Sequence, residues 1–91
     1  MKLENRRTTL HNLLDLMKEI VYDEIASQPT ITRVQLTDRL GLKIASYPQE
    51  AVTQAETSWL TSILVRKLQD EGRVFYKMLS DTRVSYSTTP F

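Results

Sequence analysis

Apolar residues at helical spacing predict a first long helix over residues 8–27. They recur three and four positions apart, which places them on one face: Leu10, Leu13, Leu14, Met17, Val21 and Ile25. Thr8 or Thr9 is the expected N-cap. Leu16 and Ile20 lie beside this stripe and widen it, either as additional core, which we favour, or as a seam for a second chain.

A second helix is predicted over residues 32–40. Thr32 and Gln35 have the spacing of a capping box, in which each side chain satisfies a backbone N–H of the other residue. Gly41 follows the last apolar position, where a left-handed residue commonly ends a helix. Thr30 and Ile31, just before the cap, could pair briefly as an edge strand.

A third helix is predicted over residues 53–71, after an insertion over residues 41–52. One predicted face carries Leu60, Ile63, Leu64, Lys67 and Leu68. Trp59 lies at the edge of this face, and we expect it to be buried with Leu64 and Leu68. Thr53 to Glu56 forms a second capping box, and Gly72 ends the helix.

The apolar period then changes from 3.6 to 2, which predicts a β-hairpin over residues 73–88. Val74, Tyr76 and Met78 alternate with Phe75, Lys77 and Leu79, and Val84 and Tyr86 alternate again after a turn at residues 80–82. Ser, Asp and Thr are residues that favour such turns. The elements together predict a single small α+β domain with three main helices and a C-terminal hairpin.

A helix that passes through one glycine into a hairpin resembles the recognition helix and wing of winged helix-turn-helix proteins. The run from Ile31 to Leu42 resembles their positioning helix. More loosely, Trp59, Leu64, Leu68 and Gly72 resemble the N-terminal winged domain of Mrr-type restriction enzymes and related modules of chromatin and restriction proteins. The insertion departs from the usual turn of about three or four residues. The resemblance implies DNA binding in many members and protein binding in others.

Composition limits the classes of function. The chain has 91 residues, 41% apolar and 25% charged, with a net charge of +1. The basic surplus lies in the hairpin, in Arg73, Lys77 and Arg83. Residues 1–7 are expected to be a flexible arm. No apolar run is long enough to span a membrane, so we expect a cytoplasmic protein without membrane contact.

The inventory of reactive side chains argues against an enzyme. There is no cysteine, so no thiolate zinc site or cysteine nucleophile is available, and His11 is the single histidine. Asp15, Glu19 and Asp23 are spaced along one helix face and are interpreted as a solvated ridge, not a metal site. We expect no catalytic residue, metal or cofactor.

Nucleic-acid binding fits the side chains better. The face of the third helix opposite Leu60 and Leu64 is predicted to carry Ser58, Thr61, Ser62, Val65, Arg66 and Gln69. Arg66 or Gln69 would read a base edge, and the short hydroxyls would approach bases and phosphates. Lys77 and Arg83 would place the wing on the DNA backbone. The alternatives are an ordinary solvated helix face and charges that protect an edge strand.

The predicted function is therefore double-stranded DNA binding by a small regulatory or mobile-element protein. The third helix would enter the major groove, and the first helix could join two copies in a homodimer. The alternative is a winged helix that binds protein without DNA, as an adaptor or a small inhibitor of a larger complex. The near-neutral charge and the insertion favour this alternative.

Overall fold

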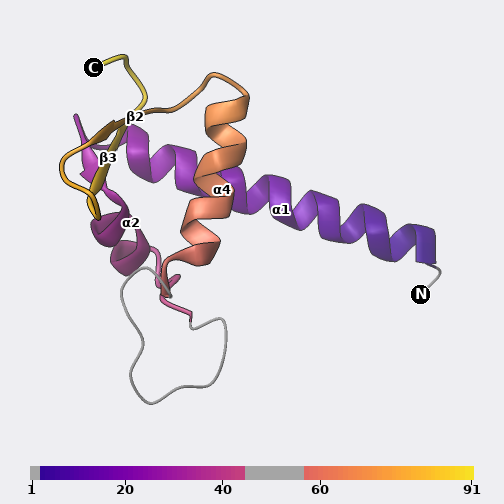
Figure 1. The fold of residues 1–91 in the computed structure, drawn as a ribbon. Helices are drawn as coiled ribbons and strands as arrows, with labels where there is room; N and C mark the ends of the chain where they lie inside the picture. The colour runs from indigo at the N-terminus through magenta and orange to yellow at the C-terminus, as the bar shows by residue number, and fades with distance from the viewer. Residues whose placement is uncertain (1–2, 45–56) are drawn as a thin grey trace.

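The computed structural model describes residues 3–44 and 57–91. This part of the chain is an α+β fold with three helices and a three-stranded antiparallel sheet (Figure 1). The elements are α1 (Leu3–Ala26), β1 (Ile31–Thr32), α2 (Arg33–Arg39), α4 (Trp59–Asp70), β2 (Phe75–Met78) and β3 (Val84–Ser87). The predicted fold class is confirmed. The second capping box and most of the predicted insertion lie outside the described residues.

The C-terminal hairpin and the edge strand form one sheet in the order β1-β3-β2. Tyr86 on β3 lies opposite Ile31 on one side and Tyr76 on the other. All four residues of β3 are buried, whereas β2 is half-buried to exposed. The short edge strand before α2 is present, one residue later than predicted, and it makes β3 the central strand.

The predicted capping box of α2 and the glycines that follow α2 and α4 are confirmed. The backbone N–H of Gln35 donates to Thr32 Oγ1 at 3.2 Å, and Thr32 N–H donates to Gln35 Oε1 at 3.1 Å, which completes the capping box. Gly41 and Gly72 adopt φ values of 65° and 73°. Only glycine takes this left-handed conformation without a steric penalty, so it ends both helices cleanly.

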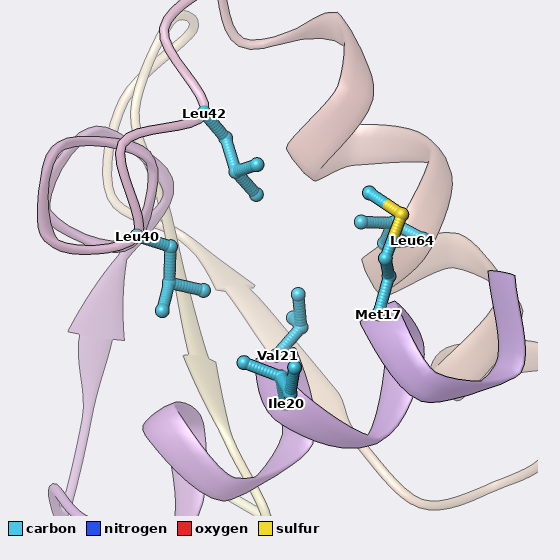
Figure 2. A pocket seen from close by; sticks show the side chains of 6 residues that line it. All are labelled: Met17, Ile20, Val21, Leu40, Leu42 and Leu64. Carbon is cyan, nitrogen blue, oxygen red and sulfur yellow. The ribbon is translucent and has the colours of Figure 1, made fainter. Parts of the chain in front are cut away.

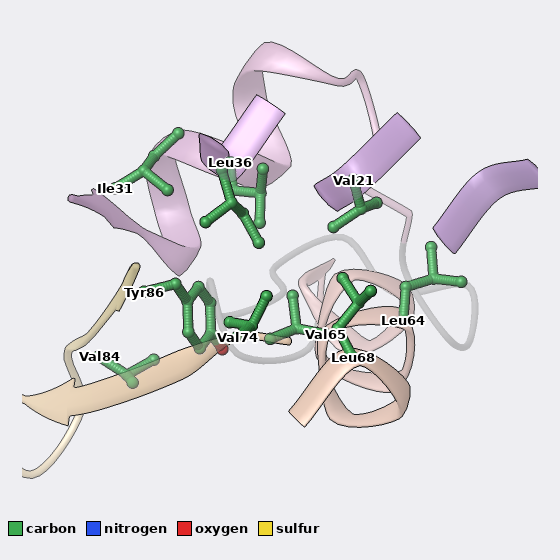
Figure 3. Close-up of a cluster of buried hydrophobic side chains, with 10 residues drawn as sticks. Val21, Ile31, Leu36, Leu64, Val65, Leu68, Val74, Val84 and Tyr86 are labelled. Atoms are coloured by element: carbon green, nitrogen blue, oxygen red, sulfur yellow. The ribbon is translucent and has the colours of Figure 1, made fainter. Parts of the chain in front are cut away.

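The core lies where the C-terminal half of α1, α2, one face of α4 and the sheet meet (Figure 3). Its buried apolar members are Val21, Ile25, Ile31, Leu36, Leu64, Val65, Leu68, Val74, Val84 and Tyr86. The predicted burial of Leu64 and Leu68 is confirmed. Both belong to the same cluster as Val21 on α1 and Leu36 on α2, so α4 packs against the two other helices through this face.

The predicted phase of α4 is wrong. Trp59 and Ile63, expected in the buried face, are 37% and 46% exposed, and Val65, expected on the opposite face, is buried. The buried side carries Thr61 and Val65 beside the two leucines. It is rotated from the predicted side by about 80°, a little less than one residue of an α-helix. Hydrophobicity alone misses this phase because a threonine hydroxyl is buried only when it finds a polar partner.

The predicted flexible arm and cap of α1 are also wrong. The helix begins at Leu3, and the Thr9 hydroxyl donates to the backbone oxygen of Asn5 at 2.8 Å inside the helix. Every residue from Asn5 to Leu16 is exposed, and the N-terminal half of α1 projects away from the other elements (Figure 1). Leu16 and Ile20 are exposed as well, so they are not part of the core.

Ion pairs connect the middle of α1 to the turn between α4 and β2. Lys18 Nζ lies 2.7 Å from Glu71 Oε2, and Arg73 Nη2 lies 2.7 Å from Glu19 Oε2. The Arg73 guanidinium also lies 4.3 Å from the centre of the Tyr22 ring, a cation–π distance. Glu19 is therefore paired and not merely solvated, and Arg73 is engaged on this side of the fold.

Stability should depend on pH through this network. The hydrogen bond from Arg73 lowers the pKa of Glu19 below its ordinary value of 4.5, and the bond from Lys18 lowers that of Glu71. A lowered folded-state pKa stabilises the fold above the unfolded-state value, and that contribution is lost as the pH falls through the folded-state pKa. We expect the melting temperature to fall on acidification below pH 4.5.

Arg73→Met is the matched test of that pH dependence, since it keeps much of the packing over Tyr22 and removes the charge. Thermal melts from pH 6 to pH 3 should show a shallower acid decline for the variant, roughly in this window. Parallel declines for the two proteins would contradict a role for the pairs with Arg73.

Candidate nucleic-acid interface

A groove of about 510 Å³ lies between α4, the N-terminus of α2 and one face of the hairpin. Its lining combines cations, a carboxylate, amide and hydroxyl groups with apolar and aromatic side chains: Arg33, Ser62, Arg66, Gln69, Asp70, Tyr76, Met78, Val84 and Tyr86. We call this the α4–hairpin groove. It is the place where the predicted recognition residues and the hairpin come together.

The structure brings together three of the predicted site residues in this groove. Ser62, Arg66 and Gln69 are four and three positions apart, so they share one side of α4. Arg66 is exposed, and the other two are half-buried. A helix side of this kind, with a long cation and an amide next to a short hydroxyl, can offer hydrogen bonds to a base edge.

Ser58 and Thr61 were predicted on the same exposed face, and this is wrong. Both are buried, because their hydroxyls meet Thr37 on α2. Thr37 Oγ1 lies 2.9 Å from Thr61 Oγ1 and 3.3 Å from Ser58 Oγ, and it donates to the backbone oxygen of Arg33 at 2.7 Å. These hydroxyls join α2 to α4 instead of facing solvent.

The hairpin cations Lys77 and Arg83 are exposed but do not line the groove. Tyr76 and Met78 face it, and successive side chains of a strand point to opposite faces, so Lys77 lies on the other face of the sheet. Arg83 lies at the turn, where its backbone oxygen accepts from Leu79 N–H at 2.8 Å. The structure therefore separates these cations from Arg66.

Arg33 is a groove residue that the sequence did not single out. Its Nε donates to the Tyr86 hydroxyl at 2.9 Å, across 53 positions of sequence. Burial raises the pKa of the Tyr86 hydroxyl, so the phenol stays neutral and can accept this bond. The bond fixes the guanidinium at the groove wall. A buried tyrosine needs a partner for its hydroxyl, but the sequence does not say which residue supplies it.

The charge of the groove is mixed. Arg66 Nε lies 3.2 Å from Asp70 Oδ1, one helical turn further along α4. Both side chains are mostly exposed, so the pair contributes only about 0.3–0.5 kcal/mol. Arg66 can therefore exchange this carboxylate for another acceptor at little cost. Asp70 itself would repel a phosphate at this position.

A metal-binding cluster and a membrane-spanning helix are both absent from the described residues. No group of three or more His, Asp or Glu side chains among them is arranged to hold a metal ion. In the same parts of the chain, no helix has the length and apolar character needed to cross a membrane. His11 is exposed on the projecting half of α1.

No family model, curated protein or solved structure matches this chain. The function must therefore be argued from the chemistry of the α4–hairpin groove and of the exposed surfaces.

Proposed function

We propose that this chain is a winged helix-turn-helix protein that binds double-stranded DNA and acts as a small regulator. The supporting observation is the α4–hairpin groove, where Ser62, Arg66 and Gln69 lie on one side of α4 beside the hairpin. An α-helix fits the major groove of B-DNA. In this proposal α4 enters that groove and the hairpin acts as the wing.

The proposed roles of the groove residues follow from the hydrogen-bond donors that their side chains carry. Arg66 would give two parallel hydrogen bonds to O6 and N7 of a guanine, and Gln69 would pair with N6 and N7 of an adenine. Ser62 would bind a base or a phosphate nearby. Arg33, already held by Tyr86, would contact a phosphate with its remaining guanidinium N–H groups.

The wing has a different proposed role. Lys77 and Arg83 lie on the outer face and the tip of the hairpin, so they would contact the backbone beside the segment read by α4. Such contacts add affinity without sequence preference. With a net charge of only +1, these few local cations must supply the electrostatic attraction.

A second candidate is a protein-binding winged helix, an adaptor or inhibitor without DNA binding. It is favoured by the exposed apolar side chains in the same groove, since Tyr76 and Met78 are 59% and 52% exposed. Exposed aromatic residues and methionines are enriched at protein interfaces. The two candidates differ in whether charge or apolar contact controls binding at this groove.

Neutralising the groove's carboxylate provides the test. Asp70→Asn removes the exposed partner of Arg66 and a repulsion toward phosphate. It should raise affinity for random duplex DNA about two- to fivefold at low salt, a free-energy change on the order of 0.5–1 kcal/mol. Arg66→Ala should instead lower affinity for the preferred site about tenfold, as expected for loss of one guanine contact.

Asp23→Asn on α1 is the matched control for net charge, because it makes the same change away from the groove. Fluorescence anisotropy with labelled duplex reports all of these variants. Equal gains from Asp70→Asn and Asp23→Asn would show that the groove is not the DNA site. No binding by any variant at low salt would favour the protein-binding candidate.

A further inference from the structure

The exposed side of α1 carries a second apolar face that the domain does not use. Leu10, Leu13, Leu16 and Ile20 are 60%, 50%, 58% and 48% exposed. At about 100° per residue they fall within an arc of about 120° centred near Leu13. Residues Val21 and Ile25, which pack into the core, are centred about 100° further round the helix. We call the exposed set the α1 outer face.

The position of this face makes exposure costly. The N-terminal half of α1 projects beyond the rest of the described fold, so no described element packs against it (Figure 1). Most helical stability in proteins comes from packing of an apolar face, and a short unsupported helix is marginal in water. An ordered, leucine-bearing helix half that projects into solvent therefore indicates a surface that is covered in the working protein.

An apolar pocket lies next to the same face. It has a volume of about 170 Å³ and is lined by Met17, Ile20, Val21, Leu40, Leu42 and Leu64. Figure 2 shows these side chains around the hollow, from α1, the end of α2 and α4. A cavity of roughly 150 Å³ holds a benzene ring, so this pocket admits one apolar side chain. Ile20 belongs to both the pocket and the α1 outer face.

The charges at the two ends of α1 are complementary to each other. Arg6 and Arg7 lie near its N-terminus, and Asp23 and Glu24 lie near its C-terminus. Within the described residues, neither arginine has an ion pair, and Glu24 contacts Arg39 through Oε1 at 3.2 Å. Arg6 and Glu24 both lie about 20° from the centre of the α1 outer face. Two copies aligned in parallel would bring the arginines together. Two antiparallel copies would bring each basic end beside an acidic end.

We propose that the α1 outer face binds the same face of a second copy, antiparallel, to form a two-fold homodimer. With the axis beside residue 15, Leu10 lies opposite Ile20, Leu13 opposite Met17, and Arg6 opposite Glu24. Each projecting half then covers the partner's apolar pocket, and Leu10 or Leu13 supplies the side chain that enters it. A two-fold interface makes every such contact twice.

This inference goes beyond DNA binding and does not depend on it. The interface uses α1 and the pocket, while the α4–hairpin groove stays open on each copy. It is smaller than the standard interface of about 800 Å² per partner, because only one helix face and one pocket contribute. We therefore expect a reversible dimer with a dissociation constant on the order of 1–10 µM.

The test is sedimentation equilibrium of the full chain without DNA, from about 1 to 200 µM around the expected dissociation constant. The mass should rise with concentration from the monomer's 10.6 kDa toward twice that value. Leu13→Glu should weaken association at least tenfold, while Asn12→Glu, the same added charge about 100° away on the helix, should have little effect. Both positions are exposed, so circular dichroism should show both variants folded.

Charge reversal tests the orientation. Arg6→Glu or Glu24→Arg alone should weaken association, and the double variant should restore it, because the antiparallel pair is re-formed with opposite signs. Disulfide trapping gives an independent measurement, since the chain has no cysteine. Leu10→Cys alone should not cross-link, because its copies would lie about 15 Å apart along the helices. Leu10→Cys with Ile20→Cys should cross-link.

A monomer at every concentration would overturn the proposal and would leave the face to another occupant. Association that Leu13→Glu does not change would show that another surface joins the copies. Cross-linking by Leu10→Cys alone would show a parallel pair and would also overturn it. None of these results bears on whether the groove binds DNA.

Discussion

Replacing Leu64 with alanine is expected to lower the free energy of unfolding by about 2–5 kcal/mol. Leu64 is fully buried in the core and lies between α4 and the C-terminal half of α1. Truncating a buried leucine removes apolar contacts and leaves a cavity, because the surrounding side chains relax only in part. Urea denaturation followed by circular dichroism measures the change directly.

Ile63→Ala is the matched control for that prediction. Ile63 precedes Leu64 on the same helix, and the sequence pattern places both in the core, but the structure leaves Ile63 46% exposed. We expect the control to cost less than about 1 kcal/mol, as surface substitutions usually do. A loss as large as that of Leu64→Ala would mean that α4 is rotated toward the phase that hydrophobicity predicts.

Local chemistry made part of the fold predictable. The capping box of Thr32 and Gln35, the left-handed glycines and the hairpin all depend on residues close together in sequence. Each of them has few alternative conformations, so the residue types suffice to identify them. The α+β class follows from these elements together.

The phase of α4 required contacts between distant residues. Thr61 and Ser58 are polar, so their residue types alone predict that they are exposed to solvent. Thr37, more than twenty positions earlier, supplies the hydroxyl that allows them to be buried. Apolar periodicity contains no information about such a partner, so it assigned Trp59 to the core in their place.

The sequence left the role of the α1 outer face open, between core and a seam for a second chain, for a different reason. Periodicity indicates that the apolar face with Leu10, Leu13, Leu16 and Ile20 packs against another element. It does not show whether that element belongs to the same chain. α1 is longer than the rest of the described domain can cover, so its N-terminal half is left exposed. Only the arrangement of the elements in space distinguishes core from interface here.

The candidate site contains some residues that local sequence predicts and others that only contacts between distant residues place there. Ser62, Arg66 and Gln69 were predicted because they share one side of a helix, which is a local property. Arg33 was missed because its place in the groove depends on a bond to Tyr86, far away in sequence. Lys77 and Arg66 were expected to act together, but the alternation of β2 puts Lys77 on the other face of the sheet.

Duplex affinity is expected to fall about a hundredfold between 50 and 200 mM salt, if α4 and the wing together make about four phosphate contacts. Each contact releases condensed counterion, so the slope of log affinity against log salt should be about −0.9 per contact. The proposed contacts come from Arg33 on α2, from the wing residues Lys77 and Arg83, and from a hydroxyl or backbone group of α4.

Single substitutions should show how much each cationic side chain contributes to that salt dependence. Arg83→Glu, at the hairpin tip, should weaken binding to all duplexes alike and make the slope shallower by about one contact's worth, roughly 0.9. Arg66→Glu should act mainly on the preferred site, because its proposed partner is a base. Lys67→Glu makes the same charge change on the next residue of α4, about 100° away from the groove, and should cost far less.

These comparisons also decide how α4 is presented to DNA. Arg66 lines the α4–hairpin groove, whereas Lys67 is exposed outside it. If Lys67→Glu weakens binding as strongly as Arg66→Glu, the helix contacts DNA through a side that the wing does not flank. If no variant changes a measurable affinity, the binding does not come from these cations. A flat response to salt would exclude phosphate contacts altogether, and the apolar side chains Tyr76 and Met78 would then point to a protein partner at the same groove.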